Sequence, residues 1–196
     1  TLRIYNWQDY IDDGSMEEDG TSILEDFKTY YLEEYGEEIE VIYDTFETNE
    51  SMFNTLKTGK TTYDLACPSE YMIMRMIKED MLEKIDFNNV PNYSNLGDKY
   101  KYLSYDPTNE YSVPYMWGTI GILYNADVVT EKVDSWDILW NEKYAGEIFL
   151  FDSLRDTLAI SLARLGYSIN STNPDEINEA AEELIKQKPL LQSYVM

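Results

Sequence analysis

The chain has 196 residues, of which 43% are hydrophobic and 27% are charged, proportions that are typical of a globular protein with one domain or two small ones. The 38 acidic residues outnumber the 15 basic ones and give a formal net charge of −23, which repels nucleic acid and anionic membranes and attracts cations. Histidine is absent and Cys67 is the one cysteine, which excludes Ser-His and Cys-His nucleophiles, an internal disulfide and most transition-metal sites.

The chain opens on an apolar, strand-like segment, Leu2–Tyr5, with no basic and apolar signal region before it. We therefore expect a secretory signal to be absent or to have been removed before this sequence begins. No run approaches 18 consecutive apolar residues, so the sequence predicts no membrane-spanning helix.

The first 85 residues predict strands and helices in alternation. The predicted strands are Leu2–Tyr5, Ile39–Tyr43 and Tyr63–Cys67. The predicted helices are one that begins after the capping-box pair Ser22 and Glu25, one capped by Asn49 and closed by Gly59, and a methionine-rich one over Glu70–Leu82. This order predicts the α/β class, with a parallel sheet covered on both faces.

Residues 86–112 are rich in Asn, Asp, Pro and Tyr, which is typical of a long surface connection. A buried strand is predicted over 119–124, so we place a first domain at 1–113 and a second at 114–196. In the second domain we expect a short helix capped by Ser135, a strand over Ile148–Phe151, an apolar helix over Leu158–Leu165, and a helix that starts at Asn173–Pro174 and ends near Gln187.

Ligands of open α/β sheets bind beyond the carboxyl ends of the strands, and polar and aromatic residues follow two predicted strands there. Trp7, Asp9 and Tyr10 follow the first strand. Their rings and carboxylate suit a cation with an apolar stem, although Trp7 as a core aromatic and Asp9 as a turn former fit equally well. Ser69 and Tyr71 follow the third strand, where Ser69 also fits a plain helix N-cap.

A pair of carboxylates, Asp152 and Asp156, flanks Arg155 after the strand that ends at Phe151. Such a pair suits an ammonium ligand, an ion pair with Arg155, a helix cap or glycoside hydrolysis. The hydrolase hypothesis is the weakest of these. Catalysis by two carboxyl groups needs one of them to have a raised pKa, whereas the positive charge of Arg155 favours the ionised form of both.

Several segments together resemble the spermidine/putrescine-binding proteins of bacterial ABC importers. They are Tyr5–Tyr10, Tyr43–Glu50, Tyr63–Ser69, Tyr111–Gly118, Ser135–Trp136 with Leu139–Trp140, and Leu165–Ser168. The resemblance implies a two-lobed periplasmic-binding-protein fold (type II) that closes on a polyamine, without catalysis or a cofactor. It also implies ABC permease subunits as partners and an extracytoplasmic location: the periplasm, or the outer face of the cell membrane as a lipoprotein or permease fusion.

The resemblance also implies the ligand-binding residues. Trp7 and Tyr10 would line the polyamine cleft, with Gln8 and Asp9 near an ammonium group and Ser69 and Tyr71 in the same wall. The family's acidic motif Asp-Asp-x-Arg-Glu is Asp152-Ser153-Leu154-Arg155-Asp156 in this chain. Asp156, helped by Asp152, would then bind an amine. Because Ser153 replaces an acid of the motif, the resemblance leaves the choice between putrescine and spermidine open.

Members of this family continue well beyond the length of this chain. We therefore expect the second lobe to be incomplete at its C-terminus, polyamine binding by this segment alone to be weak, and a dimer that exchanges elements to be a way of covering the exposed edges. Another small cation or an osmolyte is the alternative ligand.

Overall fold

The computed structural model describes residues 1–8, 10–15 and 22–195. The chain divides into two compact units, Thr1–Trp117 (unit 1) and Gly118–Met196 (unit 2). None of the described helices is long and apolar enough to cross a bilayer.

Unit 1 contains a three-stranded parallel sheet in the order β2-β1-β3, so the predicted parallel sheet is confirmed. Its strands are β1 (Leu2–Trp7), β2 (Val41–Phe46) and β3 (Leu65–Ala66). The pairing of β1 with β2 runs from Leu2 opposite Val41 to Trp7 opposite Phe46. The carboxyl ends of all three strands therefore point the same way, towards the segments that carry Trp7, Ser69 and Tyr71.

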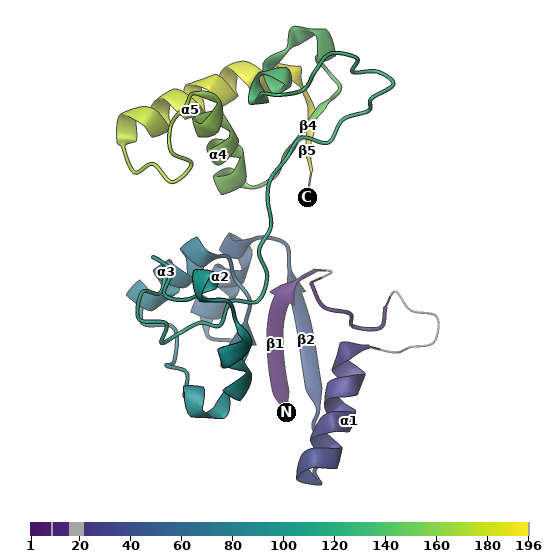
Figure 1. Ribbon diagram of the computed structural model, residues 1–196, viewed down its shortest axis with the longest axis vertical. Helices are drawn as coiled ribbons and strands as arrows, with labels where there is room; N and C mark the ends of the chain where they lie inside the picture. The colour runs from purple at the N-terminus through teal and green to yellow at the C-terminus, as the bar shows by residue number, and fades with distance from the viewer. Residues whose placement is uncertain (9, 16–21, 196) are drawn as a thin grey trace. The chain divides into compact units, whose positions relative to one another are not determined.

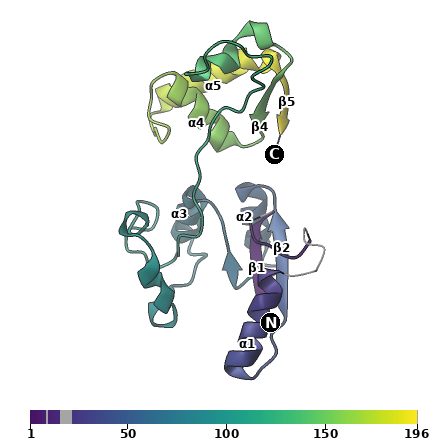
Figure 2. The same cartoon turned by 45° about the vertical axis from the view of Figure 1, so that its right-hand side comes forward.

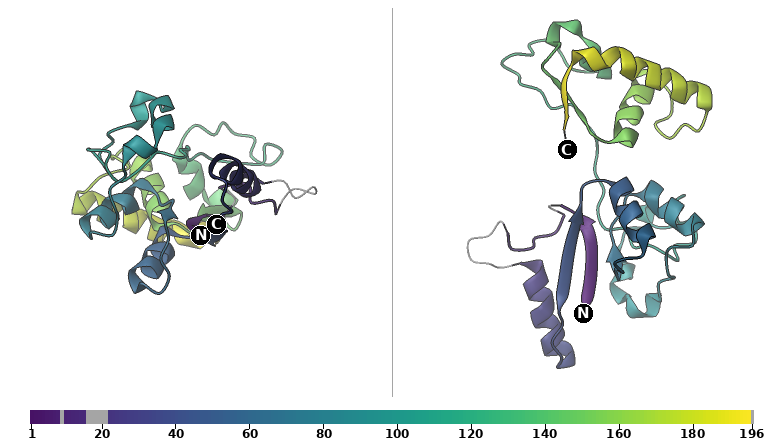
Figure 3. Two further views of the ribbon diagram at one scale, coloured as in Figure 1. Left: turned by 90° about the horizontal axis from the view of Figure 1, so that it is seen from below. Right: turned by 180° about the vertical axis from the view of Figure 1, so that it is seen from behind.

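Three α-helices accompany this sheet: α1 (Ile23–Tyr35), α2 (Asn49–Thr58) and α3 (Glu70–Lys78). The helix α1 lies on one side of the β1–β2 pair, and α2 and α3 lie on the other (Figures 1 and 3). Tyr5 and Phe46 form the core with the side chains that α2 and α3 turn inward, namely Met52, Phe53, Met72 and Met76. The methionine spacing therefore reflects core packing, as predicted. No residue of α1 is buried.

Several details of the predicted elements in unit 1 are wrong. The strand β2 covers Val41–Phe46 rather than Ile39–Tyr43. Thr48, not Asn49, caps α2, because the Thr48 hydroxyl accepts the Ser51 N–H at 3.1 Å. The helix α3 ends at Lys78 rather than Leu82, because Asp80 adopts the left-handed conformation (φ 54°) and turns the chain. The strand β3 covers only Leu65–Ala66 of the predicted strand over residues 63–67, although the N–H groups of Asp64 and Cys67 also donate to β1 carbonyls.

The connection that follows α3 is irregular apart from three short 3₁₀ helices: η1 (Phe87–Asn89), η2 (Pro91–Asn95) and η3 (Asp98–Tyr100). The predicted strand over 119–124 is wrong, because these residues have no regular secondary structure and Leu123 is 99% exposed. A strand needs a neighbouring strand to pair with its backbone, and none of the described strands pairs with these residues.

Unit 2 packs two helices and a two-stranded parallel sheet. Its elements are η4 (Trp136–Trp140), η5 (Glu142–Tyr144), β4 (Ile148–Phe151), α4 (Leu154–Arg164), α5 (Pro174–Gln187), η6 (Lys188–Leu190) and β5 (Leu191–Val195). Figure 2 shows β4 beside β5 and α4 close to α5. The caps predicted at Ser135 and Asn173 are confirmed, since each side chain accepts a backbone N–H of the first helical turn at 3.0 Å.

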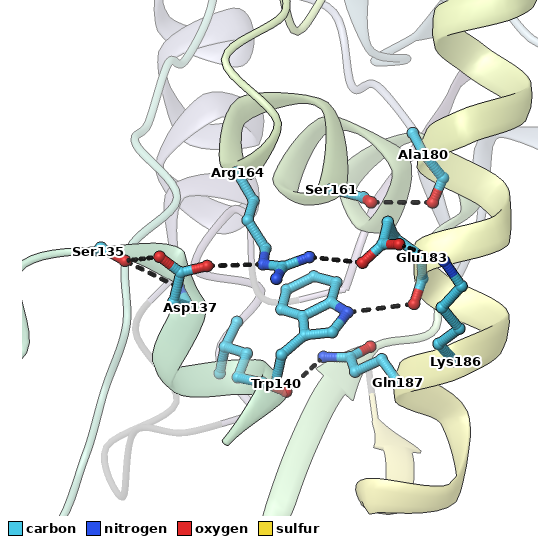
Figure 4. Close-up of polar contacts among 10 residues, drawn as sticks. Ser135, Asp137, Trp140, Ser161, Arg164, Ala180, Glu183, Lys186 and Gln187 are labelled. Atoms are coloured by element: carbon cyan, nitrogen blue, oxygen red, sulfur yellow. Dashed lines mark hydrogen bonds and ion pairs between the residues drawn. The ribbon is translucent and has the colours of Figure 1, made fainter. Parts of the chain in front are cut away.

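Arg164 joins three elements of unit 2 (Figure 4). Its guanidinium donates to Asp137 at 2.8 Å and to Glu183 at 2.7 Å, and it lies 4.5 Å from the centre of the Trp140 ring. The Trp140 indole N–H donates to the Glu183 backbone carbonyl at 3.1 Å. Because η4, α4 and α5 meet at one half-buried cation, their relative placement within unit 2 depends on its contacts.

Candidate ligand-binding site

Three aromatic side chains form a cluster where β1 ends. Trp7 is the last residue of β1, and its ring centre lies 6.1 Å from that of Tyr10, which in turn lies 6.4 Å from that of Tyr115. The Tyr115 hydroxyl donates to the Tyr10 backbone carbonyl at 2.6 Å. Tyr10 is 37% and Tyr115 is 54% exposed. This ring cluster (Trp7, Tyr10 and Tyr115) therefore presents aromatic faces to solvent beyond a strand end.

The backbone beneath the ring cluster is held by buried polar contacts. Asn6 is buried, and its side-chain oxygen accepts the Trp7 N–H at 2.8 Å. The Trp7 ring packs on Phe46 with 4.6 Å between ring centres. Trp7 thus has one face on the core, as the structural alternative proposed, and also belongs to the exposed cluster. Gln8 is exposed, and Asp9 lies outside the described residues.

Ser69 and Tyr71 lie together at the start of α3. Ser69 occupies the N-cap position, but its side chain makes no capping hydrogen bond. Instead its hydroxyl accepts from the Asn49 side-chain amide at 3.1 Å, and the Tyr71 hydroxyl accepts from the same amide at 3.0 Å. Ser69 is therefore the N-cap residue of α3, as predicted, but its side chain bonds to α2 instead of capping α3.

The structure brings these two groups of unit 1 onto one core. Trp7 and Tyr71 are both half-buried and both pack against the cluster around Tyr5 and Phe46. Trp7 ends β1 and Tyr71 follows β3, which is parallel to β1, so both lie at the edge where such sheets bind ligands. Cys67 lies between them in the chain at the end of β3, and burial raises the pKa of its thiol. Because the thiol is neutral, it carries no charge for a cation to bind, and the aromatic and hydroxyl groups are the candidate ligand contacts at this edge of the sheet.

In unit 2 the sequence-predicted residues lie where β4 gives way to α4. Ser153 is the N-cap of α4 and accepts the Asp156 N–H at 3.4 Å, so the cap of this helix is the serine rather than an aspartate. The Asp152 N–H donates to the Val195 carbonyl at 2.8 Å and continues the β4–β5 pairing. Arg155 donates to the Asn170 side chain at 2.9 Å.

Asp156 is in the first turn of α4, where a carboxylate complements the helix dipole. Asp152 is exposed and Asp156 is half-buried. Two carboxylates at the carboxyl end of a strand suit a cation. Within the described ranges, no group of three or more acidic or cysteine side chains is placed to hold a metal ion.

Asn49 and Glu50 are residues of this site that sequence reasoning missed. Asn49 is only 5% exposed and bonds both Ser69 and Tyr71, while Glu50 accepts the Tyr71 hydroxyl hydrogen at 3.0 Å. A usable signal was the spacing of Thr48 and Ser51, which form a capping box and leave the Asn49 side chain with no role in the cap.

Comparison with known proteins places the chain among binding proteins. The family described as "Bacterial extracellular solute-binding protein" matches residues 22–194. The spermidine/putrescine-binding periplasmic protein of Escherichia coli K12 is 40% identical over 196 residues, which are 99% of this chain and 52% of that protein. The chain therefore spans about half the length of the curated relatives that it matches.

Solved structures agree with that comparison. A putative spermidine/putrescine ABC transporter from Listeria monocytogenes matches with a TM-score of 0.84 and 37% identity, over 99% of this chain and 56% of that one. The spermidine/putrescine ABC transporter substrate-binding protein PotD of Streptococcus pneumoniae, in complex with calcium and HEPES, matches with a TM-score of 0.72 and 42% identity over the same shares. The structural neighbours are binding proteins, so the fold is part of a two-lobed one.

Proposed function

The chain belongs to the bacterial extracellular solute-binding protein family, and from this premise we propose that the full-length protein is the polyamine-binding component of an ABC importer. It acts outside the cytoplasm, binds spermidine or putrescine, and delivers the ligand to the permease subunits. No bond is made or broken in this function, so the protein has no catalytic residues.

The ring cluster at the end of β1 is the observation that carries this proposal. A polyamine is a flexible methylene chain with a charged ammonium at each end. Its methylenes pack on aromatic faces, and each ammonium over a ring contributes about 0.5–2 kcal/mol. Trp7, Tyr10 and Tyr115 offer such faces at 6.1 and 6.4 Å spacing, half open to solvent. The net charge of −23 attracts a polycation from solution.

The residues of the site take complementary roles in this proposal. Trp7 and Tyr10 bind the methylene chain, while Gln8 contacts one ammonium group. The hydroxyls of Ser69 and Tyr71 accept hydrogen bonds from the ligand. From unit 2, Asp156 binds an amine with help from Asp152, and Ser153 lies between these two acids as the N-cap of α4.

A panel of ligands tests this function by thermal denaturation of the full-length protein. A bound ligand stabilises the folded state by about 2.7 kcal/mol at a free concentration of 100 times its Kd. We expect spermidine and putrescine to raise the melting temperature in a concentration-dependent way. A rise with glycine betaine or choline alone would assign the osmolyte alternative, and no rise with either polyamine would contradict the proposal.

A further inference from the structure

The side chain of Asn49 connects the start of α2 with the start of α3. Its amide nitrogen donates to the Ser69 hydroxyl at 3.1 Å and to the Tyr71 hydroxyl at 3.0 Å. Its amide oxygen accepts the backbone N–H of Ser69 at 2.9 Å. Asn49 is only 5% exposed. Both N–H groups of its side-chain amide and the amide oxygen therefore bond to two residues at the start of α3.

The orientation of this amide follows from the backbone. A backbone N–H only donates, so the atom of Asn49 that faces Ser69 N–H must be the oxygen. The amide nitrogen then faces the two hydroxyls and donates to both oxygens. Neither hydroxyl can direct its own hydrogen at Asn49, so both hydrogens point elsewhere.

Glu50 determines where the Tyr71 hydrogen goes. The Tyr71 hydroxyl donates to a Glu50 carboxylate oxygen at 3.0 Å. An ionised carboxylate accepts hydrogen bonds and does not donate. With its hydrogen held by Glu50, the Tyr71 hydroxyl acts towards other groups as an acceptor, as it does towards Asn49. A hydrogen bond to a charged acceptor also makes the hydroxyl oxygen more negative. A ligand that consists of ammonium groups requires acceptors.

We propose that Asn49 and Glu50, the first two residues of α2, are positioning residues for the Tyr71 hydroxyl: Asn49 holds its oxygen beside Ser69, and Glu50 holds its hydrogen, so that the oxygen accepts from a cationic ligand. This inference rests on the proposed polyamine-binding function, and it assigns to α2 a part in selecting cations over neutral or anionic solutes. Glu50 acts through the Tyr71 hydroxyl and not merely as one more negative charge.

A double-mutant cycle on spermidine affinity, measured by titration calorimetry of the full-length protein, separates these two roles of Glu50. We expect Glu50→Gln to weaken spermidine binding about fivefold when Tyr71 is present, and less than about twofold when combined with Tyr71→Phe, because residues in one hydrogen-bond network couple. Glu47→Gln is the matched control, since Glu47 is an exposed carboxylate three residues earlier. It removes the same charge without touching the hydroxyl and should change affinity by less than about twofold.

Asn49→Leu is the second arm, because leucine has nearly the same volume and removes all three hydrogen bonds. It should weaken spermidine binding about tenfold or more, with a smaller loss when Tyr71→Phe is already present. Glu50 is exposed, so Glu50→Gln keeps the test decisive where Asn49→Leu fails to fold.

Each result of the cycle has a distinct meaning. Equal losses for Glu50→Gln with and without Tyr71→Phe, or a loss no greater than that of Glu47→Gln, would overturn the positioning role while leaving polyamine binding intact. Absence of spermidine binding by the unmodified protein would overturn the proposed function, and the positioning role with it.

Discussion

The Asp106 carboxylate accepts a hydrogen bond from the Ser112 hydroxyl at 2.8 Å. Asp106 is only 2% exposed. The same carboxylate accepts the backbone N–H groups of Glu110 at 3.2 Å and Tyr111 at 3.0 Å. One buried acid therefore organises the last turn of the long connection that leads to Tyr115 of the ring cluster.

Replacing Asp106 with alanine should destabilise the protein by about 2–4 kcal/mol, because three donors lose their buried acceptor. Urea denaturation followed by tryptophan fluorescence measures this loss. Asp98→Ala is the control, since the Asp98 side chain is fully exposed and its ion pair with Lys101 spans 3.4 Å. Equal denaturation midpoints for the two variants would show that the Asp106 contacts do not hold the connection.

The pKa of Glu183 is lowered by its hydrogen bonds with Lys186 and then Arg164. A lowered pKa in the folded state gives a stabilising contribution that is complete above the unfolded pKa of about 4.3 and disappears as the pH falls through the folded pKa. The difference in unfolding free energy between the wild type and Glu183→Gln should therefore be largest above pH 5 or so and shrink in acid.

Glu182→Gln is the matched control for this pH series, because Glu182 is an exposed neighbour on the same helix. It removes one carboxylate from the same helix without touching Arg164, so it should lower the free energy of unfolding at neutral pH less than Glu183→Gln does. A flat pH profile for Glu183→Gln would contradict a role for the Arg164 cluster in stability.

Burial raises the pKa of the Cys67 thiol, so less thiolate is present at pH 8 than in an ordinary cysteine. Because the thiolate is the reactive form, we expect iodoacetamide to alkylate the folded protein about tenfold more slowly than the protein in urea. Equal rates in the folded and unfolded states would show that Cys67 is accessible and its thiol unperturbed.

Tyr115→Phe keeps the ring but removes the hydroxyl that donates to the Tyr10 carbonyl at 2.6 Å. Loss of this hydrogen bond frees Tyr10 and should weaken spermidine binding about threefold to tenfold. Tyr35→Phe, on the exposed end of α1, serves as the control and should bind as the wild type does. Unchanged affinity in Tyr115→Phe would remove Tyr115 from the ring cluster's role in binding.

Local patterns predicted the elements whose signals lie within a few residues. The start of α5 followed from Asn173 and Pro174, and the inward face of α2 followed from the spacing of Met52 and Phe53. These signals concern one helical turn, and the structure confirms them. The parallel sheet likewise followed from the order of its elements.

The failures concern contacts between distant residues. The strand β5 (Leu191–Val195) was not predicted, because its pairing partner β4 lies about forty residues earlier and the mostly exposed Leu-Gln-Ser-Tyr-Val sequence has no clear alternation. Thr48 and Asn49 are both good helix caps by residue type. Only the position of Ser69, twenty residues further along, decides that Asn49 serves the neighbouring helix instead.

The sequence predicted only part of the site, because some of its contacts join residues that are far apart in the chain. Trp7 and Tyr10 could be selected from their place after a strand, but Tyr115 is 105 residues from Tyr10 and joins it only in the folded chain. Asn49 and Glu50 affect the site through the Ser69 and Tyr71 hydroxyls, and such indirect contacts leave no local pattern.

A crystal structure of the full-length protein with spermidine bound would test the proposed ligand contacts directly. We expect the spermidine methylenes to pack against the Trp7 indole and a terminal ammonium to bind the Asp156 carboxylate. A bound spermidine that touches neither Trp7 nor Asp156 would contradict this expectation.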